Sequence, residues 1–434
     1  METALSILIF VVVYGLIAIE KVEKTIVAIL GAFFVLLLRL VSFEDAISAI
    51  DFNVIFLLVG MMVSVYILSQ TGFFEWIATL LARKAGGDPF RITLIFLVAT
   101  AILSAFLDNV TTMILLAPVT ILIMQLLEIS PVPVLILEAL ASNIGGAATL
   151  IGDPPNIIIG SKAGLTYNDF VFHAAPGIAV VFVVFLGTVY LMFRKMWDVP
   201  LEIRERVTKS TPSLAIIDRR KMITALAVLG LILAGFMTQS LTGIESGIIA
   251  LAGSMLMLAL CRVNVDRSFI HVEWNVIFFF VGLFIIVSAL EHNGVIDLLA
   301  GGLLGAAGNN LFLLCVIVLA GSAFISAVLD NIPFTLTMAP MIREMIETLS
   351  AESGMTDHAL ITSQIAHPLW WSLVLGVCLG GNGTLIGSSV NVIVAKISEK
   401  NNCRITFMRF SRYGFPFMIQ SLVIAVLYIW IRYF

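Results

Sequence analysis

Two apolar stretches of this sequence are each interrupted by a dense run of glycine, proline and polar residues. The first interruption reads Asn143-Ile-Gly-Gly-Ala-Ala-Thr-Leu-Ile-Gly-Asp-Pro-Pro-Asn156, and the second reads Gly380-Gly-Asn-Gly-Thr-Leu-Ile-Gly-Ser-Ser-Val-Asn391. Proline has no backbone N–H and glycine adopts conformations closed to other residues, so a helix is expected to stop and restart at each place. Within a bilayer, such breaks are tolerated only where protein or a watery cavity satisfies the freed backbone groups. Their pairing in two halves of a chain is typical of a transporter binding site.

The composition places these interruptions in a membrane. Hydrophobic residues make up 60% of the 434 residues and charged residues only 12%, about half the charged share of a typical soluble domain. Long apolar runs recur, which predicts an all-α polytopic membrane protein and not a β-barrel, whose strands would show short alternating segments. The first residues lack the basic region of a cleavable signal peptide, so the first apolar run is expected to remain as a span.

The second half of the sequence repeats the first. The segment from Asp51 to Gly60 matches the segment from Glu273 to Gly282, and Ser104-Ala-Phe-Leu-Asp-Asn109 matches Ser326-Ala-Val-Leu-Asp-Asn331, both at an offset of 222 residues. After a longer loop, Thr149-Leu-Ile-Gly152 matches Thr384-Leu-Ile-Gly387 at an offset of 235 residues. Each half is therefore predicted to contain scaffold spans, a hairpin of two apolar arms, a broken helix and a final span.

The predicted boundaries follow from this repeat. The first repeat, 1–193, has scaffold spans within 3–69, a hairpin at 91–127, a broken helix at 132–165 and a span at 174–193. A basic linker covers 194–221. The second repeat, 222–434, has scaffold spans within 222–290, a hairpin at 310–349, a broken helix at 359–397 and a span at 415–431.

The hairpin arms are short for full spans, so both hairpins are interpreted as re-entrant. Each repeat then crosses five times, and the two repeats have inverted topology. The positive-inside rule places the basic linker in the cytoplasm and both termini outside a cell inner (cytoplasmic) membrane. Most Lys and Arg residues, Lys24 among them, then fall on the cytoplasmic side, which leaves Arg39, Lys162, Arg343 and Arg432 outside.

Asp108 and Asp330 occupy the predicted turns of the two hairpins, and each is followed by an asparagine. An ionisable side chain deep in a bilayer is costly unless it is paired, hydrated or neutralised, which favours a role in ion or proton transfer. The alternative is a helix cap that accepts backbone N–H bonds, although a neutral Ser or Asn would cap without burying a charge. Both roles can hold together.

Asp153 is the asymmetric acid, because its counterpart in the second break is Ser388. As the residue before a proline it is expected in an extended conformation, which suits a loop. A loop cap or a residue wetted by a shallow vestibule is one reading, and a proton-linked or cation-linked role is the other. The proton-coupling candidates are Asp108, Asp153 and Asp330.

Neutral polar residues and glycines around the breaks complete the predicted site. Such polar groups commonly form interhelical hydrogen bonds in membranes, but their clustering beside two breaks indicates ligand contact. The glycines either allow close packing or let backbone amides approach an ion. Besides the three aspartates, the predicted substrate- and ion-binding residues are Asn109, Thr111, Thr112, Asn143, Gly145, Gly146, Thr149, Gly152, Asn156, Asn331, Gly381, Asn382, Gly383, Thr384, Ser388 and Asn391.

At these residues the sequence resembles the ion transporter superfamily, particularly its branch of arsenite/antimonite permeases and P protein. The resemblance rests on the run 143–156, on Leu107-Asp-Asn-Val-Thr-Thr112 and on Leu329-Asp-Asn-Ile-Pro-Phe334, and it covers nearly the whole chain. It implies a scaffold of early spans and a transport domain of hairpins and broken helices. It also implies a substrate held at the hairpin tips and moved by an elevator-like shift.

The tips depart from those of the dicarboxylate branch, which resemble Ser-Asn-Thr. Here they read Asp-Asn-Val and Asp-Asn-Ile, and a carboxylate at each tip would repel a dianion unless it were protonated. A proton, a sodium ion or a neutral solute is favoured instead, and citrate-like substrates are disfavoured.

The expected function is proton-coupled efflux of a small inorganic solute, with arsenite or antimonite first. A sodium–proton antiporter is the alternative, and an anion or carboxylate transporter or channel is the third possibility. Walker A and HExxH motifs are absent from the sequence, so neither ATP-driven transport by this chain nor zincin chemistry is supported. No enzyme activity, cofactor or metal site is predicted. The expected partners are the solute, protons or sodium, and the lipid bilayer, with no nucleic acid; a soluble ATPase partner or a homodimer stays open.

Overall fold

The structure is a computed structural model that describes residues 2–19, 21–194, 199–209, 211–308, 310–355 and 357–434. Helices joined by short turns account for the secondary structure of these ranges. Nine helical segments among the described residues are long and apolar enough to cross a membrane. The predicted class, an all-α polytopic membrane protein, is confirmed.

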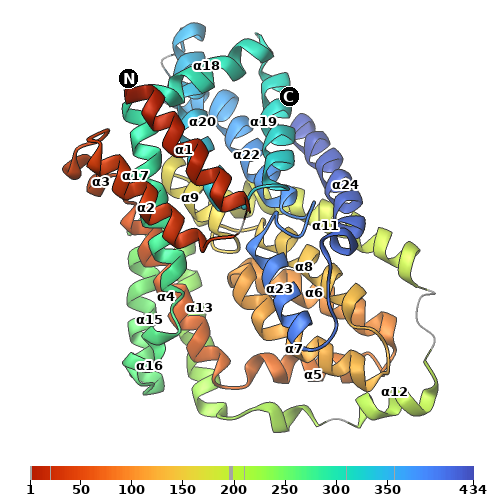
Figure 1. The fold of residues 1–434 in the computed structure, drawn as a ribbon. Helices are drawn as coiled ribbons and strands as arrows, with labels where there is room; N and C mark the ends of the chain where they lie inside the picture. Colours follow the sequence, from red (N-terminus) through yellow and green to blue (C-terminus); the bar gives the residue numbers. More distant parts are fainter. Residues whose placement is uncertain (1, 20, 195–198, 210, 309, 356) are drawn as a thin grey trace.

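The first half begins with helices that pack as a scaffold and continues with a hairpin and a broken helix (Figure 1). Its helices are α1 (Glu2–Ile19), α2 (Lys24–Leu37), α3 (Phe43–Ser48), α4 (Phe52–Ser69), α5 (Phe73–Lys84), α6 (Pro89–Phe106), α7 (Asn109–Leu126), α8 (Val132–Gly146), α9 (Pro154–Ala163), α10 (Tyr167–Asp169), η1 (Phe170–Ala174) and α11 (Ala175–Phe193). The hairpin is α6–α7, and the broken helix is α8–α9.

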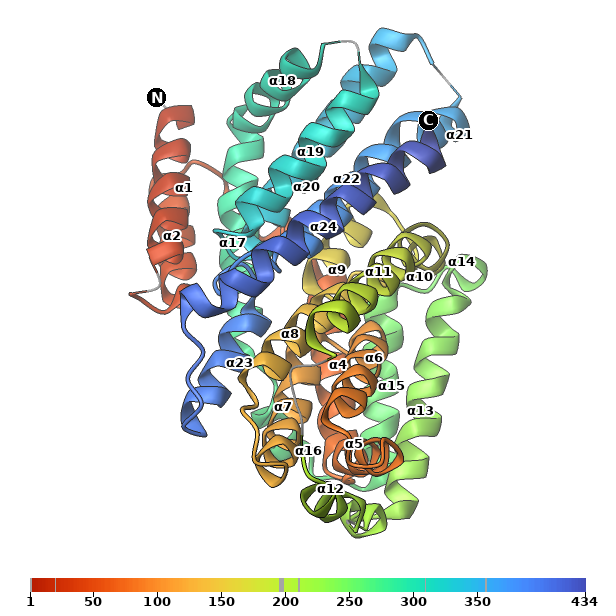
Figure 2. The ribbon, with the colours of Figure 1, turned by 90° about the vertical axis from the view of Figure 1, so that its right-hand side faces the viewer.

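The linker and the second half follow in the same order. Part of the predicted linker, residues 195–198 and 210, lies outside the described residues. The elements are α12 (Leu201–Thr208), η2 (Pro212–Ala215), α13 (Arg219–Met237), α14 (Gln239–Thr242), α15 (Ser246–Cys261), α16 (Val265–Ile270), α17 (Trp274–His292), α18 (Val295–Ala307), α19 (Leu311–Ser326), α20 (Asn331–Ser353), α21 (His358–Ile361), η3 (Thr362–Ala366), α22 (His367–Gly380), α23 (Ser389–Lys400) and α24 (Phe407–Tyr433). Here the hairpin is α19–α20, the broken helix is α22–α23, and α24 runs along α22 (Figure 2).

The two halves pack on each other reciprocally. Helix α4 of the first half crosses α15 of the second, and α17 of the second crosses α2 of the first. A Cβ atom on Gly60 would lie 2.5 Å from the backbone of Ala250, and one on Gly282 would lie 2.7 Å from the backbone of Ala28. Each residue in one contact corresponds to a residue in the other at the 222-residue offset. Reciprocity of this kind is the property of a two-fold axis that relates two copies.

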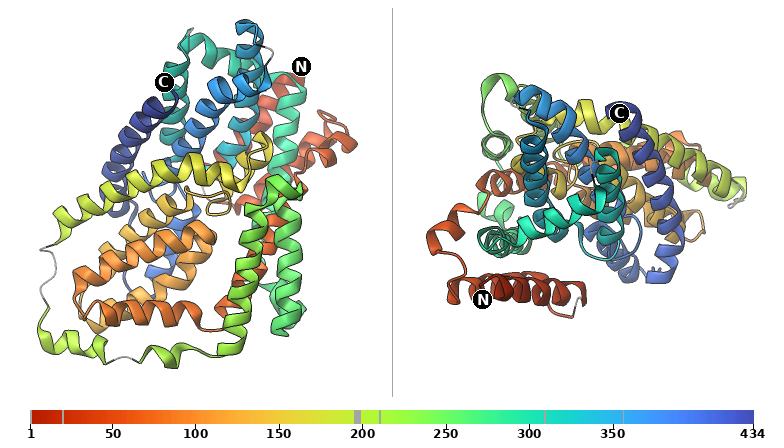
Figure 3. Two further views of the ribbon diagram at one scale, coloured as in Figure 1. Left: turned by 180° about the vertical axis from the view of Figure 1, so that it is seen from behind. Right: turned by 90° about the horizontal axis from the view of Figure 1, so that it is seen from above.

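The two hairpins approach from opposite ends of the molecule. In Figure 1, α19 and α20 lie in the upper part and α6 and α7 in the lower part. Both termini lie at the upper end, whereas α12 of the linker lies at the lower end (Figures 1 and 3). The hairpin tips at Asp108 and Asp330 nevertheless line one cavity. The repeats are therefore inverted. Both arms of the first hairpin, α6 and α7, are 18 residues long and apolar enough to cross a membrane, so the re-entrance of the hairpins stays a prediction.

Local chemistry accounts for the broken helices. Helix α8 ends at Gly146, and α9 begins with Pro154 and Pro155 in its first turn. Proline is well suited to this position because the first N–H groups of a helix have no intrahelical partner. The segment between the two helices crosses over the tip of the first hairpin, where the Asn109 N–H donates to the carbonyl of Gly152 over 3.2 Å.

Candidate functional site

A cavity of about 560 Å³ lies between the two hairpin tips, the starts of α9 and α23, and the scaffold helices α2 and α17. Six of the predicted site residues line it. They are Asp108, Asn109, Asp153, Asp330, Asn331 and Ser388. The acidic tips and both helix breaks therefore meet at one place, as the sequence predicted.

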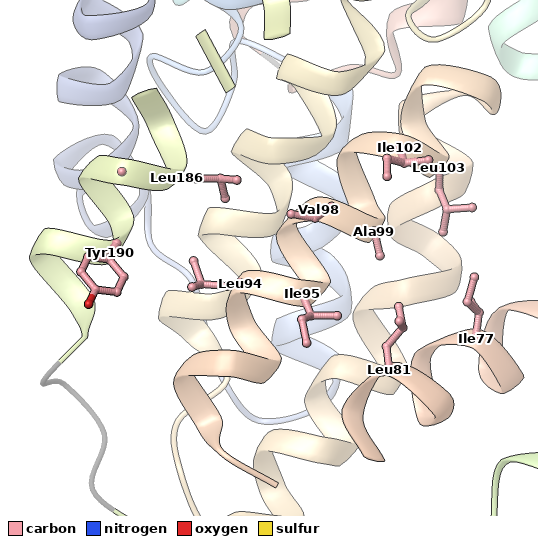
Figure 4. A pocket seen from close by; sticks show the side chains of 11 residues that line it. Ile77, Leu81, Leu94, Ile95, Val98, Ala99, Ile102, Leu103, Leu186 and Tyr190 are labelled. Atoms are coloured by element: carbon pink, nitrogen blue, oxygen red, sulfur yellow. The ribbon is translucent and has the colours of Figure 1, made fainter. Parts of the chain in front are cut away.

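A larger groove of about 670 Å³ lies between α5, α6 and α11 (Figure 4). Its lining side chains, which include Leu81, Ile95 and Leu186, are aliphatic except for Tyr190. None of the residues that line this groove carries a charge, so the groove offers an ion or polar solute little to bind. The cavity between the hairpin tips is the candidate site.

Asp108 caps the second arm of the first hairpin. Its carboxylate accepts backbone N–H bonds from Val110 at 2.9 Å and Thr111 at 3.0 Å, and the Thr111 hydroxyl also donates to it. The hydroxyl of Thr112 donates instead to the Asp108 carbonyl at 3.0 Å, which makes Thr112 a helix-start residue and not part of the cavity wall. Asp108 thus combines the predicted cap with a position in the cavity.

Asp330 caps the second hairpin and also forms an ion pair. The Lys24 ammonium group lies 2.7 Å from its carboxylate, and the Ser389 hydroxyl donates to the same oxygen at 2.9 Å. Lys24 also donates to Ser389 Oγ at 3.1 Å. Lys24 belongs to α2 of the scaffold, so this contact joins the scaffold to the second hairpin. The interpretation that counted Lys24 only as a charge of the cytoplasmic side missed this partner.

A buried amide cluster lies between the two breaks. Asn143 donates to the side-chain oxygens of Asn382 at 2.9 Å and Asn391 at 3.1 Å. Its own side-chain oxygen accepts from Ser388 at 3.1 Å and from Asn109 at 3.4 Å. The cluster links the first hairpin tip to both broken helices, so these elements are held together as one unit.

Two oxygen atoms beside this cluster lack a described partner. Asp153 is 1% exposed and accepts from Asn331 at 3.4 Å through Oδ1. Its second oxygen, Oδ2, and the side-chain oxygen of Asn109 have no hydrogen-bond partner among the described residues. Asp153 makes no capping bond to α9, so the cap reading is wrong for this residue. Buried oxygens without partners are costly, which marks this place as one that a proton or cation would complete.

Four predicted residues instead fasten the breaks to their own repeat. The Thr149 hydroxyl donates to the carbonyl of Ala105, and Thr384 makes the corresponding bond to Ala327. Asn156 donates to the carbonyls of Gly146 and Thr149, and Asn391 donates in the same way to Gly381 and Thr384. These bonds hold the shape of each broken helix, and the ligand role predicted for them remains a prediction.

The predicted glycines allow close backbone contact. A Cβ on Gly145 would overlap the backbone of Ala101, and Gly146 and Gly152 face each other across the first break. Gly381 faces Gly387 in the second break, while a Cβ on Gly383 would lie 2.5 Å from the sulfur of Met418. Their described role is packing, which was one of the two alternatives.

Six charged residues in or near the site were missed from the sequence. Five line the cavity, namely Lys21, Glu23, Lys24, Glu273 and Lys396, and Glu138 is fully buried in α8. Glu273 stands where the first repeat has Asp51, so the repeat contained a signal for it. Lys24 and Glu138 correspond to Ser246 and Leu373, so the internal repeat could not point to them.

Known proteins match this chain over most of its length. Residues 14–376 match a protein family described as citrate transporters. A protein of Mycobacterium tuberculosis described as an uncharacterized transporter is 38% identical over 100% of this chain and 99% of its own length. The P protein of Mus musculus is 33% identical over 100% of this chain and 60% of its own length. Among solved structures, the YdaH transporter of Alcanivorax borkumensis matches with a TM-score of 0.63 and 14% identity, over 99% of this chain and 98% of that one.

Proposed function

The chain belongs to the citrate transporter family and is a membrane transporter, and from this premise we propose that it exchanges a small inorganic solute for protons. Arsenite or antimonite is the first candidate solute, carried outward across a cytoplasmic membrane with the linker inside and both termini outside. The observation that carries the proposal is the meeting of two acidic hairpin tips with two helix breaks in one cavity. Paired breaks supply backbone ends, and buried acids supply a place for a proton.

The charge of the cavity favours a neutral solute or a cation over a polycarboxylate. Asp330 is compensated by Lys24, but Asp108 and Asp153 are held by neutral hydrogen-bond donors. Lys21 and Lys396 also line the cavity, but so do Glu23 and Glu273, so an anion of citrate type would meet more acidic than basic side chains. Arsenite is largely uncharged near neutral pH, and its hydroxyl groups suit amide, hydroxyl and carboxyl partners. The family's description names citrate, so citrate is the comparison that the transport assay must include.

The proposed movement separates the scaffold from the unit that holds the site. The amide cluster of Asn143 ties the first hairpin tip to both broken helices, so these parts would shift together. The scaffold helices α2, α4, α15 and α17 pack through close glycine crossings and would stay fixed. The ion pair of Lys24 with Asp330 spans this boundary and would break when the unit moves. Solute access would then alternate between the two faces.

The test is solute-driven pH change in liposomes that contain the purified protein and an internal pH dye. Arsenite, antimonite, sodium and citrate are added in turn, and arsenite is expected to change the internal pH. The substitution Asp108→Asn keeps the helix cap but removes the acid, so the rate of the solute-driven pH change should fall at least about a hundredfold, the scale on which proton-transfer groups act.

Asp218→Asn is the matched control. Asp218 caps α13 by accepting from the N–H groups two and three residues later, as Asp108 does, but it lies in the linker and its side chain is 40% exposed. The control should transport like the unchanged protein. An unchanged pH response in Asp108→Asn would remove Asp108 from the mechanism, and a response to citrate alone would overturn the choice of solute.

A sodium–proton antiporter is the second candidate. The partnerless oxygens of Asn109 and Asp153, together with the carboxylate of Asp108, are the hard oxygen donors that such a cation prefers. In that case sodium, and not arsenite, collapses a preset pH gradient in the same liposomes. A channel would conduct without coupling and would build no concentration gradient of any solute.

A further inference from the structure

We propose that Glu138 is a second proton-binding site, which lies between α8 and the first hairpin and apart from the cavity. Glu138 is in the middle of α8 and has no exposed surface. The Thr120 hydroxyl of α7 donates to its Oε1 at 2.8 Å. Its Oε2 has no hydrogen-bond partner among the described residues. The binding of this proton is independent of the proposed function, whereas its part in coupling rests on the proposed proton exchange.

The surroundings of Glu138 are apolar. Val134, one turn earlier on α8, and Leu116 and Met124, one turn either side of Thr120 on α7, belong to the same hydrophobic cluster. A carboxylate anion in such a place, with one neutral donor, is strongly disfavoured. A bound proton removes the charge and leaves the Thr120 bond intact, because Oε1 can accept in either form.

Among the described residues, no other titratable group near Glu138 makes a contact that would neutralise its carboxylate in place of a proton. Helix α8 packs against α6, α7, α11, α22, α23 and α24. The charged side chains of these helices are exposed, and none has a described contact with Glu138; they are Arg91, Lys396, Glu399, Lys400, Arg409, Arg412 and Arg432. The remaining titratable groups on or capping these helices also lack a described contact with Glu138; they are Asp88, Asp108, Tyr190, Arg194, His367, Cys378, Tyr413, Tyr428 and Tyr433. Asp108 is bound by Thr111, and the Cys378 thiol donates to Asn156.

The fold itself does not require an acid at this position. In the second repeat, Leu373 stands where Glu138 does, and Ile342 stands where Thr120 does. The alignment is supported by corresponding bonds, since Ser104 donates to the carbonyl of Ser142 and Ser326 donates to the carbonyl of Val377. The second repeat therefore packs the same junction with two aliphatic side chains. The acid and its hydroxyl partner are an addition that packing does not explain.

Polar groups lie on α8 between the turn of Glu138 and the first hairpin tip. Ser142 lies one helical turn further along α8, on the same face. Its hydroxyl lies 3.2 Å from the Ser104 hydroxyl and 3.2 Å from the carbonyl of Asn109. Asn109 lines the cavity. Ser142 has no described hydrogen bond to Glu138, so a proton from the cavity must cross the one helical turn between them to turn the Glu138 carboxylate into a neutral acid.

The proton itself is tested by infrared spectroscopy of the protein in liposomes. A buried carboxylic acid shows a carbonyl stretch apart from the amide bands, and this band should be present at neutral pH and lost in Glu138→Gln. Glu128→Gln is the matched control, because Glu128 is an exposed acid paired with Arg206. A spectrum that is the same in Glu138→Gln and in the unchanged protein would overturn the proposal.

A double variant provides the test if Glu138→Gln alone does not fold. Glu138→Leu with Thr120→Ile reproduces the aliphatic pair of the second repeat and should fold, yet lack the band. If this variant folds and keeps the band, the band belongs to another acid and the site at Glu138 is excluded.

The coupling role is read from transport in the same liposomes. The pH dependence of arsenite- or sodium-driven exchange should be lost in Glu138→Gln and kept in Glu128→Gln. An unchanged pH dependence in Glu138→Gln would overturn the coupling role. If neither solute is exchanged by the unchanged protein, the proposed function fails, while the infrared band still decides whether Glu138 holds a proton.

Discussion

Asp108 and Asp330 occupy equivalent positions at the two hairpin tips, but their partners differ. Asp330 receives an ammonium group from Lys24 and a hydroxyl group from Ser389. Asp108 receives a hydroxyl group from Thr111 and two backbone N–H groups, and no ion pair to it is described among the placed residues. The two tips are therefore related in geometry but not in charge, and a proton or cation is needed more at the first tip.

The contribution of the ion pair between Lys24 and Asp330 to the free energy of unfolding can be measured by substituting Lys24. Lys24→Gln leaves a nearly buried Asp330 carboxylate without its cation, and such a loss is strongly destabilising for a fully buried pair. The Lys24 side chain is 31% exposed and that of Asp330 is 11% exposed. Screening by solvent should therefore reduce the loss in the free energy of unfolding to about 1–2 kcal/mol. Thermal unfolding in detergent, followed by circular dichroism, measures this change.

The double variant Lys24→Gln with Asp330→Asn should recover most of that loss, because both charges are then removed. The control is Arg343→Gln, which breaks an exposed pair with Glu347 and should change stability by less than about 0.5 kcal/mol. A double variant that is less stable than Lys24→Gln alone would show that Lys24 does not act through Asp330.

At the scale of elements, each broken helix fits against its own hairpin through a glycine. Gly145 of α8 meets Ala101 of α6, and Gly380 of α22 meets Ala323 of α19. These pairs are equivalent in the two repeats. Each crossing brings two backbones so close that no side chain fits between them. This contact fixes the position of the hairpin tip relative to the helix break.

Gly145→Ala and Gly380→Ala should each push a hairpin away from its broken helix. Overpacking of this kind is expected to destabilise the protein by about 1–3 kcal/mol and to widen the cavity. Gly230→Ala is the control, because no atom lies within 4 Å of a Cβ at this position of α13. It should be neutral or slightly stabilising. Equal melting temperatures for all three variants would show that the crossings are not tight.

The breaks and hairpin tips could be predicted because local chemistry determines them. Pro154 and Pro155 follow polar and glycine residues and suit the first turn of a helix, and Asp is a favoured cap, a role that Asp108 takes and Asp153 does not. The amide cluster could not be predicted in detail, because Asn143 and Asn382 are 239 residues apart in sequence. The internal repeat helped only with features that both halves share. It therefore gave no signal for Lys24 or Glu138, whose counterparts are uncharged.

At the scale of the whole molecule, the scaffold and the site-bearing unit meet at α2. Lys24 contacts Ser389 of the second broken helix, whereas its neighbour Thr25 contacts the carbonyl of Asn275 within the scaffold. Two adjacent residues of α2 thus face the two parts that are proposed to move relative to each other.

Cross-linking can separate these two parts. A thiol cross-link in Lys24→Cys with Ser389→Cys should abolish transport, and a reductant should restore it, because the contact must break in each cycle. The same cross-link in Thr25→Cys with Asn275→Cys joins two scaffold helices, so transport by this variant should be the same with and without the reductant. Both pairs are placed in a Cys403→Ser background, since the other native cysteines are buried. Full transport with Lys24 and Ser389 positions cross-linked would exclude a shift at this boundary.

The ammonium group of Lys24, which pairs with the second hairpin tip and has no counterpart at the first, makes the two sides of the carrier chemically different. If the inverted copies were chemically identical, a half-turn would convert the form open on one side into the form open on the other, with the same affinity at both. Because Lys24 has only Ser246 as its counterpart, the same solute meets a different set of charges on each face. The affinity for the solute should then differ between the two faces. Without a driving gradient, transport must end at equal solute concentrations on both sides. The populations of the two empty forms must therefore differ by the ratio that offsets the difference in affinity.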